Sequence, residues 1–222
     1  MDNDNVIKVV LTTRQSLTCS DEENEYIIQI DGQILEQTED EEDEPVEAGS
    51  LRAYLVQRDR MDEDGRDFWQ EVDAHSHLLL DAMQAIIDVE TSEYRETIDE
   101  MSKQTLVNTD VLVLDLVAIL PDYRGRGLGL VASQRVLDLY GSGCGVAVTL
   151  PCPLQHYPAH AVDPKSAARM RYDLFTADEA AGRRKISRHW KELGFKKIPD
   201  SEYMVLFFGL DRPTMRDLLG GA

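Results

Sequence analysis

The sequence predicts a mixed α/β fold, and three patterns favour that class. Val- and Ile-rich segments at residues 6–13 and 26–34 have the composition of strands. Residues 111–120 are almost continuously apolar, as expected for a central strand that is covered on both faces. A predicted helix over residues 128–140 then leads to a short strand at residues 145–150, and this strand–helix–strand order implies that the two strands are parallel.

The remaining elements of the first half are predicted from shorter patterns. Asp31-Gly32, inside the second strand, is a candidate turn that would split this strand into a hairpin. Residues 39–44 form an acidic run that we interpret as a solvated loop, with a lure for a cationic substrate as the alternative. Residues 49–58 alternate as a strand does, residues 61–66 are typical of a charged turn, and residues 68–89 carry apolar side chains at helical spacing.

Two further elements are expected in the second half. The sequence Thr176-Ala177-Asp178-Glu179 matches a capping box, which predicts a helix from there to about Leu193. Gly194 is expected to end this helix in the left-handed conformation. Tyr203–Leu210 is the last predicted strand. At 222 residues the chain suits a single domain that spans residues 1–222.

The charge of the chain is unevenly distributed. The formal net charge is −19 overall, but it is −22 over residues 1–110 and +3 over residues 111–222. The acidic half would repel nucleic acid and attract a cationic partner, although acidity can also serve only to keep a protein soluble. We therefore expect a cationic partner or substrate and no binding of nucleic acid.

Cysteine usage and the absence of long apolar runs favour a cytoplasmic protein. Cys19, Cys144 and Cys152 are an odd number and form no Cys-x-x-Cys pair, which favours a reducing compartment over a disulfide framework. The N-terminus lacks an apolar signal segment, and no apolar run approaches the roughly 20 residues that span a bilayer. No membrane association is expected, and the sequence leaves a homodimer open.

The segment RGRGLG, residues 124–129, follows the predicted central strand and opens the next helix. Glycine lets the backbone approach a ligand closely, and a helix N-terminus presents unpaired N–H groups with a partial positive charge. Arg124 and Arg126 add full positive charges, so the loop suits a diphosphate. The glycine spacing differs from the dinucleotide-binding Gly-x-Gly-x-x-Gly, and a Walker phosphate loop would need Gly-Lys-Ser/Thr, which the chain lacks.

The same segment resembles Arg/Gln-x-x-Gly-x-Gly/Ala, the acyl-CoA signature of the GNAT superfamily of N-acetyltransferases. Pro121-Asp122-Tyr123 is similar to the Pro-Glu-Tyr that precedes this signature, and residues 189–195, HWKELGF, resemble the family's Tyr-x-x-Leu-Gly-Phe block. The resemblance covers roughly residues 107–210. It implies the GNAT fold, a mixed and mostly antiparallel sheet with a splayed central parallel strand pair flanked by helices. Residues 1–106 would add the first strands, the acidic loop and a helix.

The function that the resemblance implies is acetyl-CoA-dependent transfer of an acetyl group to a primary amine. The pantetheine arm of acetyl-CoA would add to the edge of the central strand, and the helix N-terminus would hold the diphosphate. No metal is expected, because no His, Cys, Asp and Glu residues have the spacing of a metal site. A non-catalytic acyl-CoA sensor or scaffold is the alternative, and a protein-binding module with a vestigial site is a third hypothesis. The residues expected to bind the cosubstrate are Val117, Ile119, Leu120, Arg124, Gly125, Arg126, Gly127, Leu128 and Gly129.

The catalytic residues are less clearly defined. Trp190 stands where many family members carry a tyrosine that protonates the CoA thiolate, and an indole N–H cannot act as an acid at neutral pH. Asp115 is a candidate base because burial would raise its pKa, with a structurally partnered carboxylate as the alternative. Tyr157 and His156 follow the second parallel strand, where Tyr157 is a candidate acid and packing of a lid is the alternative. Cys152 is a less favoured candidate nucleophile, because direct transfer needs none.

Overall fold

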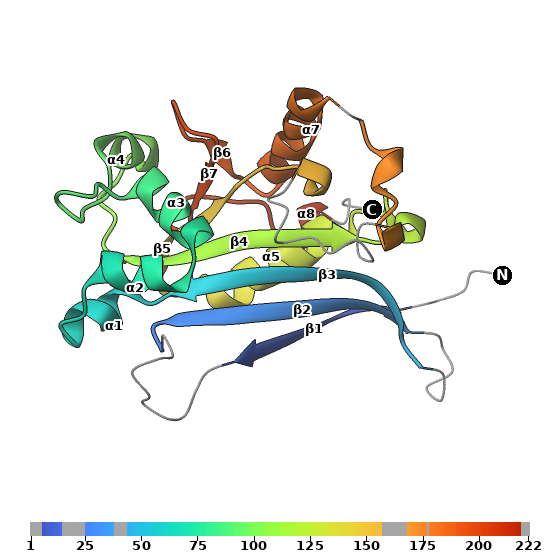
Figure 1. Cartoon of the computed structure of the whole chain (residues 1–222), viewed down its shortest axis with the longest axis horizontal. Helices are drawn as coiled ribbons and strands as arrows, with labels where there is room; N and C mark the ends of the chain where they lie inside the picture. The colour runs from blue at the N-terminus through green and yellow to red at the C-terminus, as the bar shows by residue number, and fades with distance from the viewer. Residues whose placement is uncertain (1–5, 15–24, 38–43, 157–167, 177, 219–222) are drawn as a thin grey trace.

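A seven-stranded sheet organises the part of the chain that the structure describes, in the order β1-β2-β3-β4-β5-β7-β6 (Figure 1). The structure is a computed structural model and describes residues 6–14, 25–37, 44–156, 168–176 and 178–218. The strands are β1 (Val6–Arg14), β2 (Ile27–Gln37), β3 (Val46–Val56), β4 (Asp110–Ile119), β5 (Cys144–Thr149), β6 (Lys196–Lys197) and β7 (Met204–Phe207). All neighbours are antiparallel except β4 and β5, which are parallel. The predicted mixed α/β class with one parallel pair is therefore confirmed.

Helices pack against both faces of this sheet. They are α1 (Arg58–Glu63), α2 (Phe68–His75), α3 (His77–Ile86), α4 (Glu96–Ser102), α5 (Leu128–Tyr140), α7 (Glu179–Glu192) and α8 (Met215–Leu218). One hydrophobic core lies between the sheet and α1–α4, and the other lies between the sheet and the helices α5 and α7 (Figure 1). None of the helices that the structure describes is both long enough and apolar enough to cross a membrane.

The sequence predicted the centre of the sheet closely. The helix expected over residues 128–140 is α5 with the same bounds, and the two strands that flank it form the parallel pair. The helix expected to end near Leu193 is α7, and Gly194 follows it with φ of +96°. The side chain that caps this helix is Asp178, which accepts from the N–H of Ala181 at 3.1 Å, so the capping box placed the cap two residues early at Thr176.

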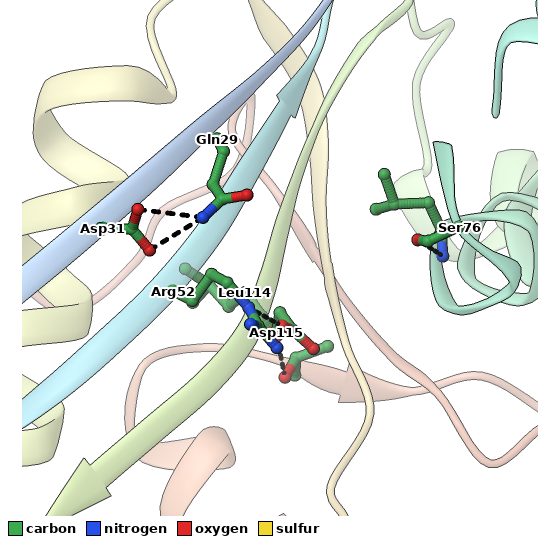
Figure 2. Close-up of polar contacts among 8 residues, drawn as sticks. Gln29, Asp31, Arg52, Ser76, Leu114 and Asp115 are labelled. Carbon is green, nitrogen blue, oxygen red and sulfur yellow. Dashed lines mark hydrogen bonds and ion pairs between the residues drawn. The ribbon is translucent and has the colours of Figure 1, made fainter. Parts of the chain in front are cut away.

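Three predictions for the first half were wrong in detail. Asp31-Gly32 makes no turn, because β2 runs through it; a Cβ on Gly32 would lie 2.5 Å from Cγ of Leu51, so the glycine serves cross-strand packing. The single helix expected over residues 68–89 is two helices, because Ser76 is extended and its side chain accepts from the N–H of Leu79 at 3.2 Å (Figure 2). Residues 61–66 contain the end of a helix, α1, where a charged turn was expected.

A β-bulge interrupts β4 at its midpoint. Arg52 of β3 pairs with Leu116, whereas the next residue, Ala53, pairs with Leu114, so that Asp115 is the extra residue. Such a bulge bends the strand and redirects a side chain. The Thr149 hydroxyl, at the end of β5, donates to the carbonyl oxygen of Leu114 at 2.9 Å and fixes the backbone just before the bulge (Figure 2). Beyond the bulge, β4 keeps its pairing with β3 but no longer pairs with β5.

Candidate functional site

A cavity of about 850 Å³ lies beside the end of β4. Its walls come from the last residues of β4, the glycine loop with the start of α5, the segment after β5, residues 170–176, and one side of α7. The first two walls contain most of the residues that the sequence assigned to acetyl-CoA. The lining residues from these two walls are Asp115, Val117, Ile119, Tyr123, Arg124, Gly125, Gly127, Leu128, Gly129 and Leu130.

The edge of β4 that faces β5 becomes free inside this cavity. Pairing of β4 with β5 ends at Leu114 and Thr149, whereas pairing of β4 with β3 continues to Ile119. The N–H of Leu120 donates to the carbonyl oxygen of Ala48 at 2.9 Å, on the β3 side. Because backbone groups alternate along an antiparallel pair, those of Val117 and Ile119 point away from β3. The edge can therefore pair with an extended ligand, although the carbonyl oxygen of Ile119 already accepts from Nε of Arg124. Leu120, which the sequence included among the binding residues, directs its N–H to β3.

The glycine loop gives α5 an open N-terminus. Gly125 and Gly127 have φ of +78° and +73°, a conformation that strains any residue with a Cβ. A Cβ on either would meet no described atom within 4 Å, so the described residues leave the space in front of the loop open. Gly127 is the N-cap, and no side chain in the described part of the chain caps the helix. The first N–H groups of α5 are thus available to an anion, and the helix dipole favours negative charge there.

Arg126 points away from the cavity. Both of its terminal nitrogens lie 3.3 Å from Oε1 of Glu36 on β2, and Tyr123 donates its hydroxyl to Oε2 of the same carboxylate at 2.9 Å. Arg126 is absent from the cavity wall. Its side chain therefore anchors the loop to β2, and only its backbone shares in the loop that would hold a diphosphate. The prediction that Arg126 lends its charge to the ligand is not supported by this side-chain orientation.

Arg124 faces the cavity but already has partners. Its Nε donates to the carbonyl oxygen of Ile119 at 3.0 Å, Nη2 donates to the carbonyl oxygen of Met170, and the guanidinium carbon lies 4.4 Å from the centroid of the Phe175 ring. Burial lowers the pKa of Arg124, although an arginine remains charged at neutral pH. Arg124 therefore connects the end of β4 to residues 170–175, which cover the cavity, besides placing positive charge beside the loop.

Asp115 lies in the cavity wall and is paired. Its Oδ2 is 2.5 Å from Nε of Arg52, and its side chain is 1% exposed, compared with 31% for Arg52 (Figure 2). Asp31, which Gln29 contacts at 2.9 and 3.0 Å, sits opposite Arg52 in the register of β2 and β3 (Figure 2). A carboxylate at the bulge could accept a proton from an amine, but the pair with Arg52 is the structurally partnered arrangement that was the alternative prediction.

The structure describes the candidate nucleophile, Cys152, but not the candidate acid, Tyr157. Tyr157 lies outside the described residues, and His156 is the last described residue before that gap. Cys152 lines the cavity as a buried free thiol; burial raises its pKa, and the positive charge of Arg183 lowers it in part. A thiol with a raised pKa holds little thiolate at neutral pH, which disfavours Cys152 as a nucleophile.

Trp190 forms part of the cavity wall. Its side chain is buried, and its ring packs edge-on against Phe195 at 5.6 Å between centroids. The indole Nε1 is buried and has no hydrogen-bond partner within the residues that the structure describes. Because this N–H is buried, it is not exposed at the cavity surface. A ligand would therefore contact the ring carbons of Trp190.

The prediction from sequence missed Tyr203, the residue before β7. Met204, Thr149 and Leu114 form one row of paired residues across β7, β5 and β4. Tyr203 precedes Met204 and Asp115 follows Leu114, so each is next to this row. Burial raises the pKa of Tyr203, and the charges of Asp81, Glu202 and Asp115 raise it further. The phenol therefore stays protonated at neutral pH, but its ring packs against the core between the sheet and α1–α4 and does not line the cavity. Its place at the edge of a short strand gave no signal in the sequence.

Comparison with known proteins adds no assignment. No family model matches the chain, and no curated protein or solved structure matches it significantly. Within the described ranges, no three His, Cys, Asp or Glu side chains lie close enough together to hold a metal ion.

Proposed function

We propose that the chain is an acetyl-CoA-dependent N-acetyltransferase with the fold of the GNAT superfamily. The observation that carries the proposal is that a free strand edge and an uncapped helix N-terminus meet in one cavity. The strand edge suits the amide-bearing pantetheine arm, which would pair with Val117 and Ile119. The helix N-terminus, with Gly125 and Gly127, suits the diphosphate.

In this proposal the thioester lies beside Asp115, where β4 and β5 separate. A neutral amine attacks the thioester carbon, a base takes the proton of the amine, and the CoA thiolate leaves and is protonated. Asp115 is the candidate base, and Tyr157 is the candidate acid. The −22 charge of residues 1–110 favours a cationic small molecule or a basic peptide as the acceptor.

Calorimetry with acetyl-CoA and release of CoA thiol in the presence of a mixture of amines test this proposal together. Binding of acetyl-CoA and amine-dependent thiol release are expected. The absence of any binding would overturn it.

A non-catalytic acyl-CoA-binding protein is the second candidate. Two points favour it: Asp115 is already paired with Arg52, and the cavity wall has Trp190 at the position where the resemblance implies a tyrosine acid. Binding of acetyl-CoA without thiol release for any amine would support this candidate. Identification of a co-purified ligand by mass spectrometry would name the acyl chain in either case.

A further inference from the structure

Two cations on α7 face the cavity and have no polar partner among the described residues. Lys185 and Arg188 line its wall, and both are exposed. Neither makes an ion pair or a hydrogen bond with any residue in the described part of the chain. By contrast, Arg183 on the same helix pairs with Glu179 and Glu202 at 2.9 and 3.2 Å. The spacing of three residues puts Lys185 and Arg188 on one side of the helix.

Contact between α7 and α5 places these cations beside the glycine loop. Nε2 of His189 lies 3.5 Å from the position that a Cβ would take on Gly129, so α7 touches the first turn of α5 there. Arg188 is next to His189 in the sequence. Lys185 precedes His189 by four residues, or about 6 Å along the helix axis. Glu192, one turn beyond Arg188, is the acidic residue on this wall. The two cations therefore lie near the open N-terminus of α5 but do not belong to it.

The chemistry of the ligand gives these cations a role. Coenzyme A carries a diphosphate and, on the ribose beyond it, a 3'-phosphate monoester that is close to doubly charged at neutral pH. Arg124 is engaged with Ile119 and Met170, and Arg126 with Glu36, so neither guanidinium is free for this second phosphate. We propose that Lys185 and Arg188 bind the 3'-phosphate and make the cavity selective for 3'-phosphorylated coenzyme. This inference rests on the proposed function.

Calorimetry on the full chain with CoA and with 3'-dephospho-CoA tests it, independently of catalysis. Two charge-assisted contacts at an exposed wall should make CoA bind about 10-fold more tightly than 3'-dephospho-CoA. The double variant Lys185→Gln/Arg188→Gln should bind the two compounds equally, at the level of 3'-dephospho-CoA. Arg184→Gln is the matched control, because Arg184 is an exposed cation on α7 that does not line the cavity, and it should keep the full preference.

The outcomes separate this inference from the proposed function. Equal affinity of the wild-type chain for the two compounds would overturn the inference and leave the proposed function intact. A double variant that keeps the preference, or a control that loses it, would also overturn the inference. If the wild-type chain binds neither compound, the proposed function fails together with the inference.

Discussion

Trp190 is where the sequence departs most clearly from the family pattern that it resembles, and its surroundings explain how the departure can be tolerated. The ring packs on Phe195 and lines the cavity, while Nε1 is buried without a partner within the described residues. An unpaired buried donor carries a desolvation cost, so removing it should cost little stability. Trp190 can therefore serve as an apolar wall of the cavity without supplying a proton.

We accordingly expect Trp190→Phe to retain most of the turnover and the affinity for acetyl-CoA, with a change in unfolding free energy within about 1 kcal/mol. Trp190→Ala opens the wall and should weaken acetyl-CoA binding. Trp190→Tyr should raise turnover, because the phenol restores a proton donor at this position. Steady-state kinetics, calorimetry and denaturant unfolding measure these effects. A large loss of kcat in Trp190→Phe, with binding and folding intact, would show that the indole N–H takes part in the reaction.

Asp115 poses a different question, because its pair with Arg52 can be structural while the carboxylate also acts as a base. Its side chain is 1% exposed, so replacing it with Asn removes a buried carboxylate that Nε of Arg52 contacts. We expect Asp115→Asn to lower the free energy of unfolding by about 1–3 kcal/mol, which is less than the loss of a partner costs a fully buried ion pair, because Arg52 is partly solvated. Asp73→Asn is the control: Asp73 is 57% exposed and should have little effect.

A double-mutant cycle with Arg52→Gln separates the two roles. Strong coupling between the two substitutions in denaturant unfolding would assign Asp115 a structural partner. Unchanged stability in Asp115→Asn combined with loss of kcat would instead identify the carboxylate as the base.

The glycine loop and α5 are the element for which sequence and structure agree best. Its positive φ values and uncapped helix start follow from Arg124–Gly129 alone, since glycine spacing is a local property of the chain. Local patterns could not show that Arg126 turns to Glu36, some 90 positions earlier, or that Tyr203 lies near Asp115, because those contacts depend on how distant strands align. The break at Ser76 was missed for another reason: apolar spacing continues through it, and only the cap reveals it.

The same element gives a prediction that separates backbone conformation from charge. Gly127→Glu puts a carboxylate at the open N-terminus of α5 and should abolish acetyl-CoA binding, because the carboxylate would compete with the diphosphate for the same N–H groups. Gly127→Asn should retain binding, since asparagine tolerates the left-handed conformation at modest cost and a Cβ meets nothing within 4 Å. Calorimetry and thermal melting of both variants provide the measurement. Equal affinity of Gly127→Glu and the wild-type chain for acetyl-CoA would place the diphosphate elsewhere.

At the scale of the whole molecule, the charge asymmetry follows the architecture. Residues 1–110 supply β1–β3 and α1–α4, and carry −22; residues 111–222 supply α5, α7 and the glycine loop, and carry +3. The proposed polyanionic coenzyme would thus bind in the less acidic half. On the opposite face of the sheet, α3 carries Asp81, whose charge acts on Tyr203 at the start of β7. Donor and acceptor would then be drawn to the site by opposite charges.

We therefore expect the chain to acetylate spermidine in preference to glutamate. At saturating acetyl-CoA, kcat/KM for spermidine should fall severalfold as NaCl rises from about 0.05 M to about 0.5 M, because the Debye length shrinks from more than 10 Å to less than 5 Å over that range. Asp81→Asn should weaken this preference for the cation by raising KM, and Asp73→Asn, which removes the same charge on α2, should not. Initial rates of thiol release for both amines, at each salt concentration and in each variant, provide the measurement. A faster reaction with glutamate than with spermidine, or a rate for spermidine that is independent of salt, would show that the acidity of residues 1–110 does not select the acceptor.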